Sequence, residues 1–514
     1  MRRMNLVIVM AVFTLCNCLV SLLICYHYPE FIPRVRMLLA LTSRDHENTS
    51  EDIIASVQKG AINSVIQSSA GKHSKQEAFL LNRNIPTPTT RRNERLPQML
   101  QQTHNSSGQL FLNKSRFDAV LGEGGLENRF PPRRPYQSEF QQVDVRIFIY
   151  SAIYEKTHSS VRTLILVPEP FNPVSFVCVL KRTRSHVGYW VQGHFRHISL
   201  SRWGTYNNRC GFVHCPVPHG SYPEFISVLT ARMSSPLNIL PVNYPGPPYN
   251  RLTRCYHAMH GNFTDVNTLV TALETNRYFG TDKFLIYNYS IPEDVNKVLL
   301  HYEREGIVEM RNWKLPFPPD QIHYWGQMAS IHDCVFSQLG VAKYVLLADV
   351  DEIVVPKKDI SLADLADRLL NTKKPNSKNM YGALMFPNAD FPIHENETKI
   401  EFPEKEDAKK FKMHAFLHTD RSYINNPRDK AKILVKPEVV DLLHVHNMKK
   451  FLPGWAMYVV SPEVALMHHY RTSKKTQTYH PLRQDSTFIK FSNSLIPKIK
   501  DRLLHLQSKL EVNI

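Results

Sequence analysis

The hydrophobic residues of this chain fall into short runs, and the run at residues 341–356, VAKYVLLADVDEIVVP, is interrupted by acids. Tyr344 to Ala348 lead into Asp349-Val350-Asp351-Glu352, and Ile353 to Val355 follow. A continuous apolar run rich in β-branched residues is typical of a strand that is buried on both faces. Because an unpaired buried carboxylate is very costly, acids at the end of such a strand need a partner. We therefore predict a ligand site at this strand end, with solvated surface acids as the alternative.

Strands and helices alternate along residues 241–480, and the acidic strand belongs to this series. Before it, the hydrophobic periodicity predicts strands at 254–259, 283–288 and 307–313, and helices at 265–278, 292–304 and 326–339. After it, we expect a helix at 361–370, strands at 381–386 and 432–435, and histidine-bearing runs at 441–447 and 464–471. The order predicts an α/β fold with a mainly parallel, doubly wound sheet, whose ligand edge lies at the carboxyl ends of the strands. An amphipathic helix at 492–510 closes a C-terminal tail, residues 481–514.

The pattern is different at residues 141–240. Short β-rich runs such as VRIFIYSAIY and RTLILVP alternate with polar or proline-containing turns, which predicts a small antiparallel domain. Cys178, Cys210 and Cys215 could cross-link it. The sequence does not indicate what this domain does.

The N-terminal region has the pattern of a membrane-anchored protein. Residues 6–26 carry no charge and are long enough to span a bilayer, and Arg2 and Arg3 precede them. We predict an uncleaved signal anchor with a cytosolic tail at 1–5, with a cleaved signal peptide as the alternative. Residues 27–140 are rich in Ser, Asn, Gln, Arg and Pro, so we expect a largely disordered luminal stem. Six N-glycosylation sequons support a luminal location, at Asn48, Asn105, Asn113, Asn262, Asn288 and Asn396.

The charge and the cysteine content indicate which partners and which disulfides to expect. The formal net charge is +17, yet the basic residues form no long block, so we expect anionic ligands or surfaces and no nucleic-acid partner. Five of the eight cysteines follow the stem. An odd number predicts one or two disulfides and one free or intermolecular thiol, which leaves a disulfide-linked homodimer open.

A series of segments between Arg254 and Arg471 resembles a known family. The segments are FLIYNYS, VLLHYEREGIVEMRNW, GQMASIHDCVF, ADVDEIVVP, KILVKPEVV, HVHNM and MHHYR. In this order they are similar to glycosyltransferase family 92, a group of Golgi galactosyltransferases with a GT-A fold. One segment departs from the family pattern, because YHAMHG follows Cys255 where a sequence closer to VSPLYG is expected.

The resemblance implies β-galactosyl transfer from UDP-galactose to a sugar of a glycoprotein glycan, with inversion, by a type II Golgi membrane protein. It also implies a divalent ion, Mn²⁺ or Mg²⁺, which stabilises the nucleotide diphosphate leaving group. Asp349 and Asp351 project to the same side of an extended chain and could bind one such cation. Asp351 would then be a direct ligand, Asp349 would hold the ribose or a metal-bound water, and Glu352 would orient them. Terminal galactose is the acceptor that we favour.

Further site residues follow from this resemblance and from the places of the residues at strand ends and helix starts. A third metal ligand is expected from a late histidine, for which we favour His469, then His446, over His444 and His468. Arg471 or Lys436 would meet phosphate charge, Gln327 would lie near the donor, and Asp333 would be its structural neighbour. Asp390 is our candidate catalytic base, and Glu352 is the next candidate. Glu395, Glu397 and Glu401 rank lower, because they lie in a polar stretch that is typical of a solvated loop.

Two other function classes remain open at this point. An apolar strand ending in Asp-x-Asp also begins the haloacid-dehalogenase phosphatases, in which the first Asp is the nucleophile. Those proteins continue with Thr or Val where this chain has Ile353, and the motif normally begins their domain. The non-enzymatic alternative is a membrane-anchored lectin or scaffold on an inactive transferase fold.

Overall fold

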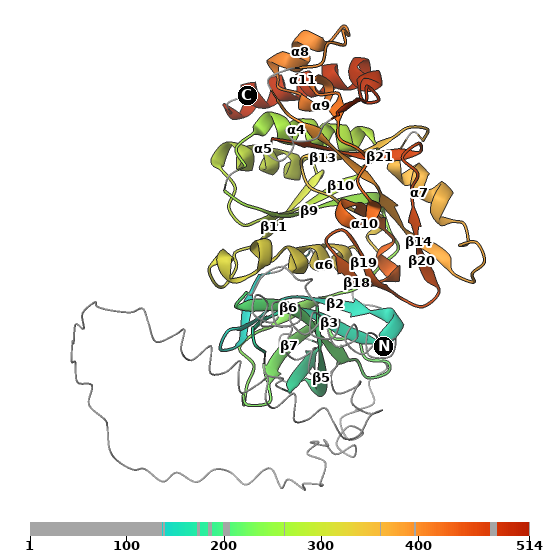
Figure 1. The fold of residues 1–514 in the computed structure, drawn as a ribbon. Coiled ribbons are helices and arrows are strands. Elements are labelled where there is room, and N and C mark those ends of the chain that lie inside the picture. Colours follow the sequence, from blue (N-terminus) through green and yellow to red (C-terminus); the bar gives the residue numbers. More distant parts are fainter. Residues whose placement is uncertain are drawn as a thin grey trace, which may run out of the picture. The chain divides into compact units, whose positions relative to one another are not determined.

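The computed structural model describes Tyr136 and residues 139–171, 175–182, 188–198, 206–261, 263–359, 361–394, 397–472 and 481–512 (Figure 1). The predicted tail, anchor and nearly all of the predicted stem lie outside these ranges, as do the sequons other than Asn288. No helix within them is long and apolar enough to cross a membrane. The described residues all belong to one compact unit.

The strands expected after the stem are present and mostly antiparallel. They are β1 (Gln141–Asp144), β2 (Ile147–Glu155), β3 (Ser160–Pro168), β4 (Phe176–Lys181), β5 (Tyr189–His197), β6 (Asn208–Pro216), β7 (Phe225–Thr230) and β8 (Leu240–Asn243). Their order is β1-β2-β3-β6-β5-β4-β7-β8, and β2 also pairs with β8, so the sheet closes on itself. A disulfide between Cys178 and Cys215 joins β4 to β6 inside its core.

A sheet of seven strands forms the centre of the α/β part, in the order β11-β10-β9-β12-β17-β14-β20. The strands are β9 (Asn250–Met259), β10 (Lys283–Asn288), β11 (Val308–Asn312), β12 (Ala342–Leu347), β14 (Met380–Phe386), β17 (Lys432–Val435) and β20 (Trp455–Val459). β11, β10, β9 and β12 are parallel, as predicted, whereas β17 is antiparallel to both of its neighbours. This one antiparallel strand has consequences for the site.

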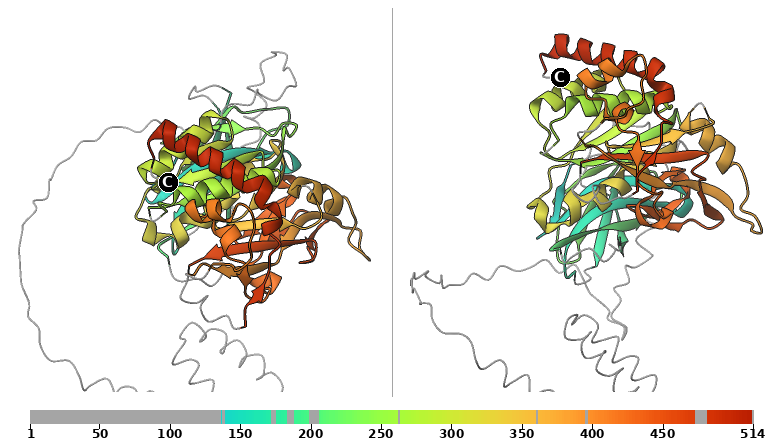
Figure 2. Two further views of the ribbon diagram at one scale, coloured as in Figure 1. Left: turned by 90° about the horizontal axis from the view of Figure 1, so that it is seen from above. Right: turned by 45° about the horizontal axis from the view of Figure 1, so that its top comes forward.

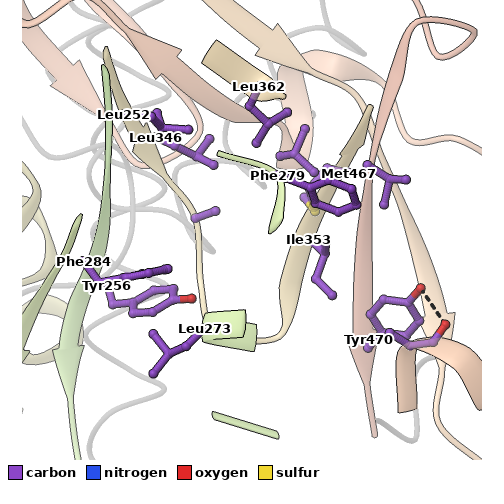
Figure 3. Packing of buried hydrophobic residues seen from close by; sticks show 14 of the residues in the cluster. Leu252, Tyr256, Leu273, Phe279, Phe284, Leu346, Ile353, Leu362, Met467 and Tyr470 are labelled. Carbon is purple, nitrogen blue, oxygen red and sulfur yellow. Dashed lines mark hydrogen bonds between the residues drawn. The ribbon is translucent and has the colours of Figure 1, made fainter. Parts of the chain in front are cut away.

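Helices cover both faces of this sheet because successive side chains of a strand point to opposite faces. Tyr344 and Leu346 of β12 face the cluster formed by α4 (Val266–Tyr278) and α5 (Glu293–Arg304), part of which is drawn in Figure 3. Val345 and Leu347 face α6 (Gln327–Ser337) instead. The C-terminal helix α11 (Ser492–Leu510), red in Figure 2, packs across α4 with the bounds predicted from its periodicity.

The antiparallel β-rich region shares a hydrophobic core with the α/β part. The Tyr150 and Trp313 rings meet edge to face at 4.7 Å, and the Tyr150 hydroxyl donates to the Asn312 carbonyl at 2.9 Å. Phe212 packs against Phe336 of α6 in the same cluster. The two regions are therefore joined by packing as well as by the chain.

The predicted acidic strand is in fact two strands in two different sheets. β12 ends at Leu347, and β13 (Glu352–Pro356) pairs in a second sheet, in the order β13-β21-β15, with β21 (Ala465–Arg471) and β15 (Asn388–Pro392). The reason for the break is local: the Glu352 carboxylate accepts a hydrogen bond from the Asp349 backbone N–H at 2.7 Å, which closes a tight turn. The acids thus lie in the turn between the two sheets.

Several shorter elements complete the described chain. They include α7 (Leu362–Leu370), α8 (Lys405–Lys410), α9 (His414–Leu417), β16 (Asp420–Arg421), α10 (Pro427–Lys430), β18 (Val440–His444), β19 (Asn447–Phe451) and β22 (Arg483–Gln484).

The cysteines after the stem form two disulfides and one free thiol, within the predicted range. Cys255 at β9 is joined to Cys334 in α6, in addition to the Cys178–Cys215 bridge. Cys210 is free and buried, so it is not available on the surface for a disulfide to a second copy.

Candidate functional site

The acidic turn of residues 348–351 lies at the carboxyl end of β12, next to the end of the parallel strand β9. Buried Arg254 of β9 holds the turn in place, because its guanidinium donates to the carbonyl oxygens of Asp349 at 2.8 Å and Glu352 at 2.5 Å. The Asp349 and Asp351 side chains remain 32% and 42% exposed. Two carboxylates are therefore open to a ligand at the sheet edge, where ligands bind in open α/β sheets.

A buried lysine neutralises the inner part of this turn. The Lys432 ammonium lies 3.0 Å from Asp349 Oδ2 and 3.0 Å from Glu352 Oε2. Burial alone would raise the pKa of Asp349, but Lys432 and His257 outweigh burial and hold that pKa well below its usual range. Burial raises the pKa of Glu352 despite the lysine, and the two acids together raise the pKa of Lys432. Lys432 and His257 thus keep Asp349 ionised.

His469 joins the exposed acid to a buried one. Its Nε2 lies 3.2 Å from Asp351 Oδ2, and its Nδ1 lies 3.2 Å from Asp390 Oδ1. Burial would lower the pKa of His469, but its bonds to Asp351 and Asp390 raise that pKa to about 10. His469, our first choice among the late histidines, therefore faces the acidic turn directly.

Two further histidines stand near Asp349. His257 Nε2 lies 2.9 Å from Asp349 Oδ1, at the end of β9. His446, our second choice, follows β18, and burial together with the charge of Lys432 lowers its pKa to about 4, so this imidazole is neutral near pH 7. The sequence reasoning missed His257, although the departure YHAMHG at this strand end was a signal for it.

An exposed aromatic group lies beside these histidines on a strained segment. Tyr324, Trp325 and Gly326 all have positive φ, at 45°, 52° and 76°, a conformation that costs about 1–2 kcal/mol for each residue other than glycine. Trp325 stacks on His260 at 3.7 Å, and Tyr324, 46% exposed, meets the His257 ring at 5.3 Å. Strained backbone conformations of this kind cluster at functional sites, where they are part of how a side chain is positioned.

The structure places two predicted ligand-binding residues elsewhere. Lys436 follows the far end of β17 and lies over the Trp455 ring at 5.3 Å. Because β17 runs antiparallel to β12, Lys432 at its start is beside the acids, and Lys436 is a strand length away. Asp333, expected as the structural neighbour of Gln327, has a carboxylate that is 0% exposed, bonds to Arg311 and accepts from the Tyr287 hydroxyl. Lys436 is therefore not beside the acidic turn, and the Asp333 carboxylate is occupied by protein partners.

The two predicted catalytic bases are also enclosed. Asp390 is 0% exposed and is held between His469 and Lys430, whose Nζ lies 3.3 Å from its Oδ2. Glu352 is buried against Lys432. A base must come within hydrogen-bond reach of the acceptor hydroxyl. Asp390 and Glu352 both bond protein cations here, and their assignment as the base stays a prediction.

Three further candidates stay predictions. Gln327 is the first residue of α6 and its side chain is buried beside the strained segment. Arg471 ends β21, two residues after His469 and on the same side of the strand. Glu397 is exposed, with its carboxylate 3.9 Å from the Lys409 ammonium.

The protein side chains at this site would supply only some of the ligands of a hard divalent cation. Within the described ranges, no three His, Cys, Asp or Glu side chains are arranged to hold a metal ion. Asp351 and His469 do face each other, however, and a carboxylate with an imidazole suits Mn²⁺. Nucleotide-bound divalent ions commonly take their remaining ligands from phosphate oxygens and water, so two or three protein ligands suffice.

The fold and the site define a class: an α/β protein with acids paired with histidine and lysine at the carboxyl edge of parallel strands. The sequence profile of glycosyltransferase family 92 matches residues 250–505, which contain all of these groups. The chain belongs to this family.

Individual relatives are distant. The chain is 24% identical over 250 residues to the beta-1,4-galactosyltransferase galt-1 of Caenorhabditis elegans, covering 45% of this chain and 56% of that protein. It is 22% identical over 187 residues to the glycosyltransferase family 92 protein ZK381.2 of the same organism, covering 34% of each. This chain thus spans about half or less of the length of these relatives. The glucosyl-3-phosphoglycerate synthase of Mycobacterium tuberculosis is 8% identical with a TM-score of 0.22, which supports no argument about fold.

Proposed function

We propose that this protein transfers galactose from UDP-galactose to a terminal sugar, galactose being favoured, of glycoprotein N-glycans, with inversion to a β-linkage. Membership of the family and the name of the first relative support glycosyl transfer and galactose as the sugar. The parallel strand order β11-β10-β9-β12, with acids at the end of the fourth strand, supports a GT-A arrangement. The single observation that carries the proposal is that Asp349 and Asp351 stand open at this edge between His257 and His469.

The residues that would hold a divalent ion are Asp351 and His469, with Asp349 and His446 alongside. A bound Mn²⁺ would supply a positive charge against the diphosphate as the glycosidic bond breaks. Lys432 keeps Asp349 ionised, so that this carboxylate can accept hydrogen bonds from ribose hydroxyls or from ordered water. Arg254 fixes the backbone of the turn, which keeps both acids in one arrangement before the donor arrives.

The proposal also includes a cellular location, the Golgi membrane with the catalytic part in the lumen. The uncharged segment at residues 6–26 is the anchor that we propose. The two disulfides support a luminal location, because disulfides persist in oxidising compartments.

The experiment is a donor and acceptor screen with the purified protein. We expect Mn²⁺-dependent transfer to galactose-terminated glycans on an array with UDP-galactose, and none after chelation by EDTA. Transfer from a different nucleotide sugar would change the donor but keep the reaction class. Phosphate release without a sugar product would favour a phosphatase, and glycan binding without any product would favour a lectin.

A further inference from the structure

We infer that Asp390 is a positioning residue for His469: its buried carboxylate accepts the Nδ1 proton of the imidazole and so directs Nε2 at Asp351, where a cation would bind. This inference rests on the proposed metal-dependent function. It gives the candidate base of the sequence analysis a different role.

The register of the second sheet brings these groups together. Asp390 of β15 and His469 of β21 are paired neighbours, and Glu352 lies opposite His469 on the other side. The Asp390 carboxylate is fully enclosed, and its backbone exchanges hydrogen bonds with Ser422 at 3.0 and 2.9 Å. The carboxylate therefore cannot turn toward solvent, and the imidazole that it holds has little freedom.

The chemistry of an imidazole makes the position of its proton decisive. A neutral histidine donates from one nitrogen and offers a lone pair on the other, and the group bonded to the first selects which is which. A carboxylate on Nδ1 can only accept, so Asp390 keeps a proton on Nδ1 when a cation takes the place of the proton that Nε2 shares with Asp351 in the metal-free protein. Lys430, 3.3 Å from the second oxygen of Asp390, balances the buried charge.

The neighbouring histidine shows that this arrangement is particular to His469. His468 points to the opposite face of β21, is fully buried, and stacks on the Phe391 ring at 4.2 Å. Its Nδ1 meets the Tyr470 hydroxyl at 3.0 Å instead of an acid. Of the two successive histidines, only His469 has a carboxylate on each ring nitrogen.

The test measures metal affinity without catalysis. The full-length protein is titrated with Mn²⁺ at a fixed concentration of UDP in an isothermal calorimeter. The heat of Mn²⁺ binding to UDP without protein is subtracted. The quantity measured is the Mn²⁺ concentration that gives half-maximal UDP binding. Asp390→Asn keeps the size of the side chain but can donate to Nδ1 and so favour the wrong tautomer. We expect this concentration to rise about 10- to 100-fold, with UDP affinity in EDTA unchanged.

A double variant separates positioning from general damage. Asp390→Asn in a His469→Ala background should cause no further loss of Mn²⁺ dependence, because the imidazole that it orients is gone. Lys430→Met is the matched control, since it removes a partner of the same carboxylate but leaves the Nδ1 contact, and we expect a change below threefold. If Asp390→Asn does not fold, Asp390→Ser provides the same measurement.

The outcomes distinguish this inference from the proposed function. If wild-type UDP binding does not respond to Mn²⁺, the metal-dependent function itself is wrong, and the inference with it. Suppose instead that UDP binding depends on Mn²⁺ in the wild type and that this dependence is lost in His469→Ala. If Asp390→Asn then shows the same Mn²⁺ dependence as the wild type, only the inference about Asp390 is overturned.

Discussion

Lys432 binds Asp349 across the gap between two strands, with 3.0 Å between its Nζ and Asp349 Oδ2, and the same ammonium bonds Glu352 at 3.0 Å. One buried ammonium therefore bonds two acids, Asp349 in the acidic turn and Glu352 at the start of β13. The pairing depends on the reversed direction of β17, which places its first residue beside the last residues of β12.

Lys432→Met should strongly destabilise the protein, because it removes the buried ammonium that bonds both Asp349 and Glu352. Removing one partner of a buried pair typically costs about 3–5 kcal/mol. Lys436→Met, at the opposite end of β17, is the matched control and should cost far less. Urea unfolding of both variants checks this, and equal losses would show that Lys432 has no special role.

Replacing Tyr324 should separate stability from ligand binding. Glycine adopts positive φ freely, so Tyr324→Gly should be about 1 kcal/mol more stable than Tyr324→Ala, since both lose the ring and differ only in the strain at φ 45°. Both variants should raise the KM for UDP-galactose to the same extent, because the exposed ring is absent in each. Equal stability would show that the segment is not strained, and an unchanged KM would remove Tyr324 from the site.

The ion pair between Arg196 of the β-rich region and Asp441 of the α/β part should make the free energy of unfolding depend on pH in the acid range. Burial would raise the pKa of Asp441, but Arg196 of β5 and Lys450 lower it to about 2. A depressed pKa stabilises the folded state above the unfolded pKa, near 4, and this contribution is lost as the pH falls toward 2. From a shift of this size we expect Asp441→Asn to lose about 2 kcal/mol at pH 7 and about half of that at pH 3. A difference that does not change with pH would contradict this origin.

The order of elements and most of their bounds could be predicted from the sequence, because local patterns determine them. The strand Lys283–Asn288 and the helix Ser492–Leu510 match their predicted ranges. Asp265, predicted as the first residue of α4, is its N-cap, with its carboxylate accepting from the Thr268 N–H at 2.9 Å. These features depend on residues a few positions apart.

The composition of the site could be predicted only where it follows from such patterns. The acidic turn and His469 were found because each ends an apolar run. Lys432 was missed because its partner depends on the direction in which β17 enters the sheet, which no local pattern contains. The burial of Asp390 depends on β21, Ser422 and Lys430, all brought to it from later parts of the chain.

The most direct test of the central claim is the rate of sugar transfer from UDP-galactose to a galactose-terminated glycoprotein by the wild type, Asp351→Ala and Asp501→Ala. Asp351 is 42% exposed, so its removal should leave the fold intact, and Asp501 of α11 is an exposed control far along the chain. We predict product from the wild type and from Asp501→Ala, each lost in EDTA and restored by Mn²⁺, and at least about a 100-fold lower rate from Asp351→Ala. Transfer by folded Asp351→Ala at the wild-type rate would contradict the account.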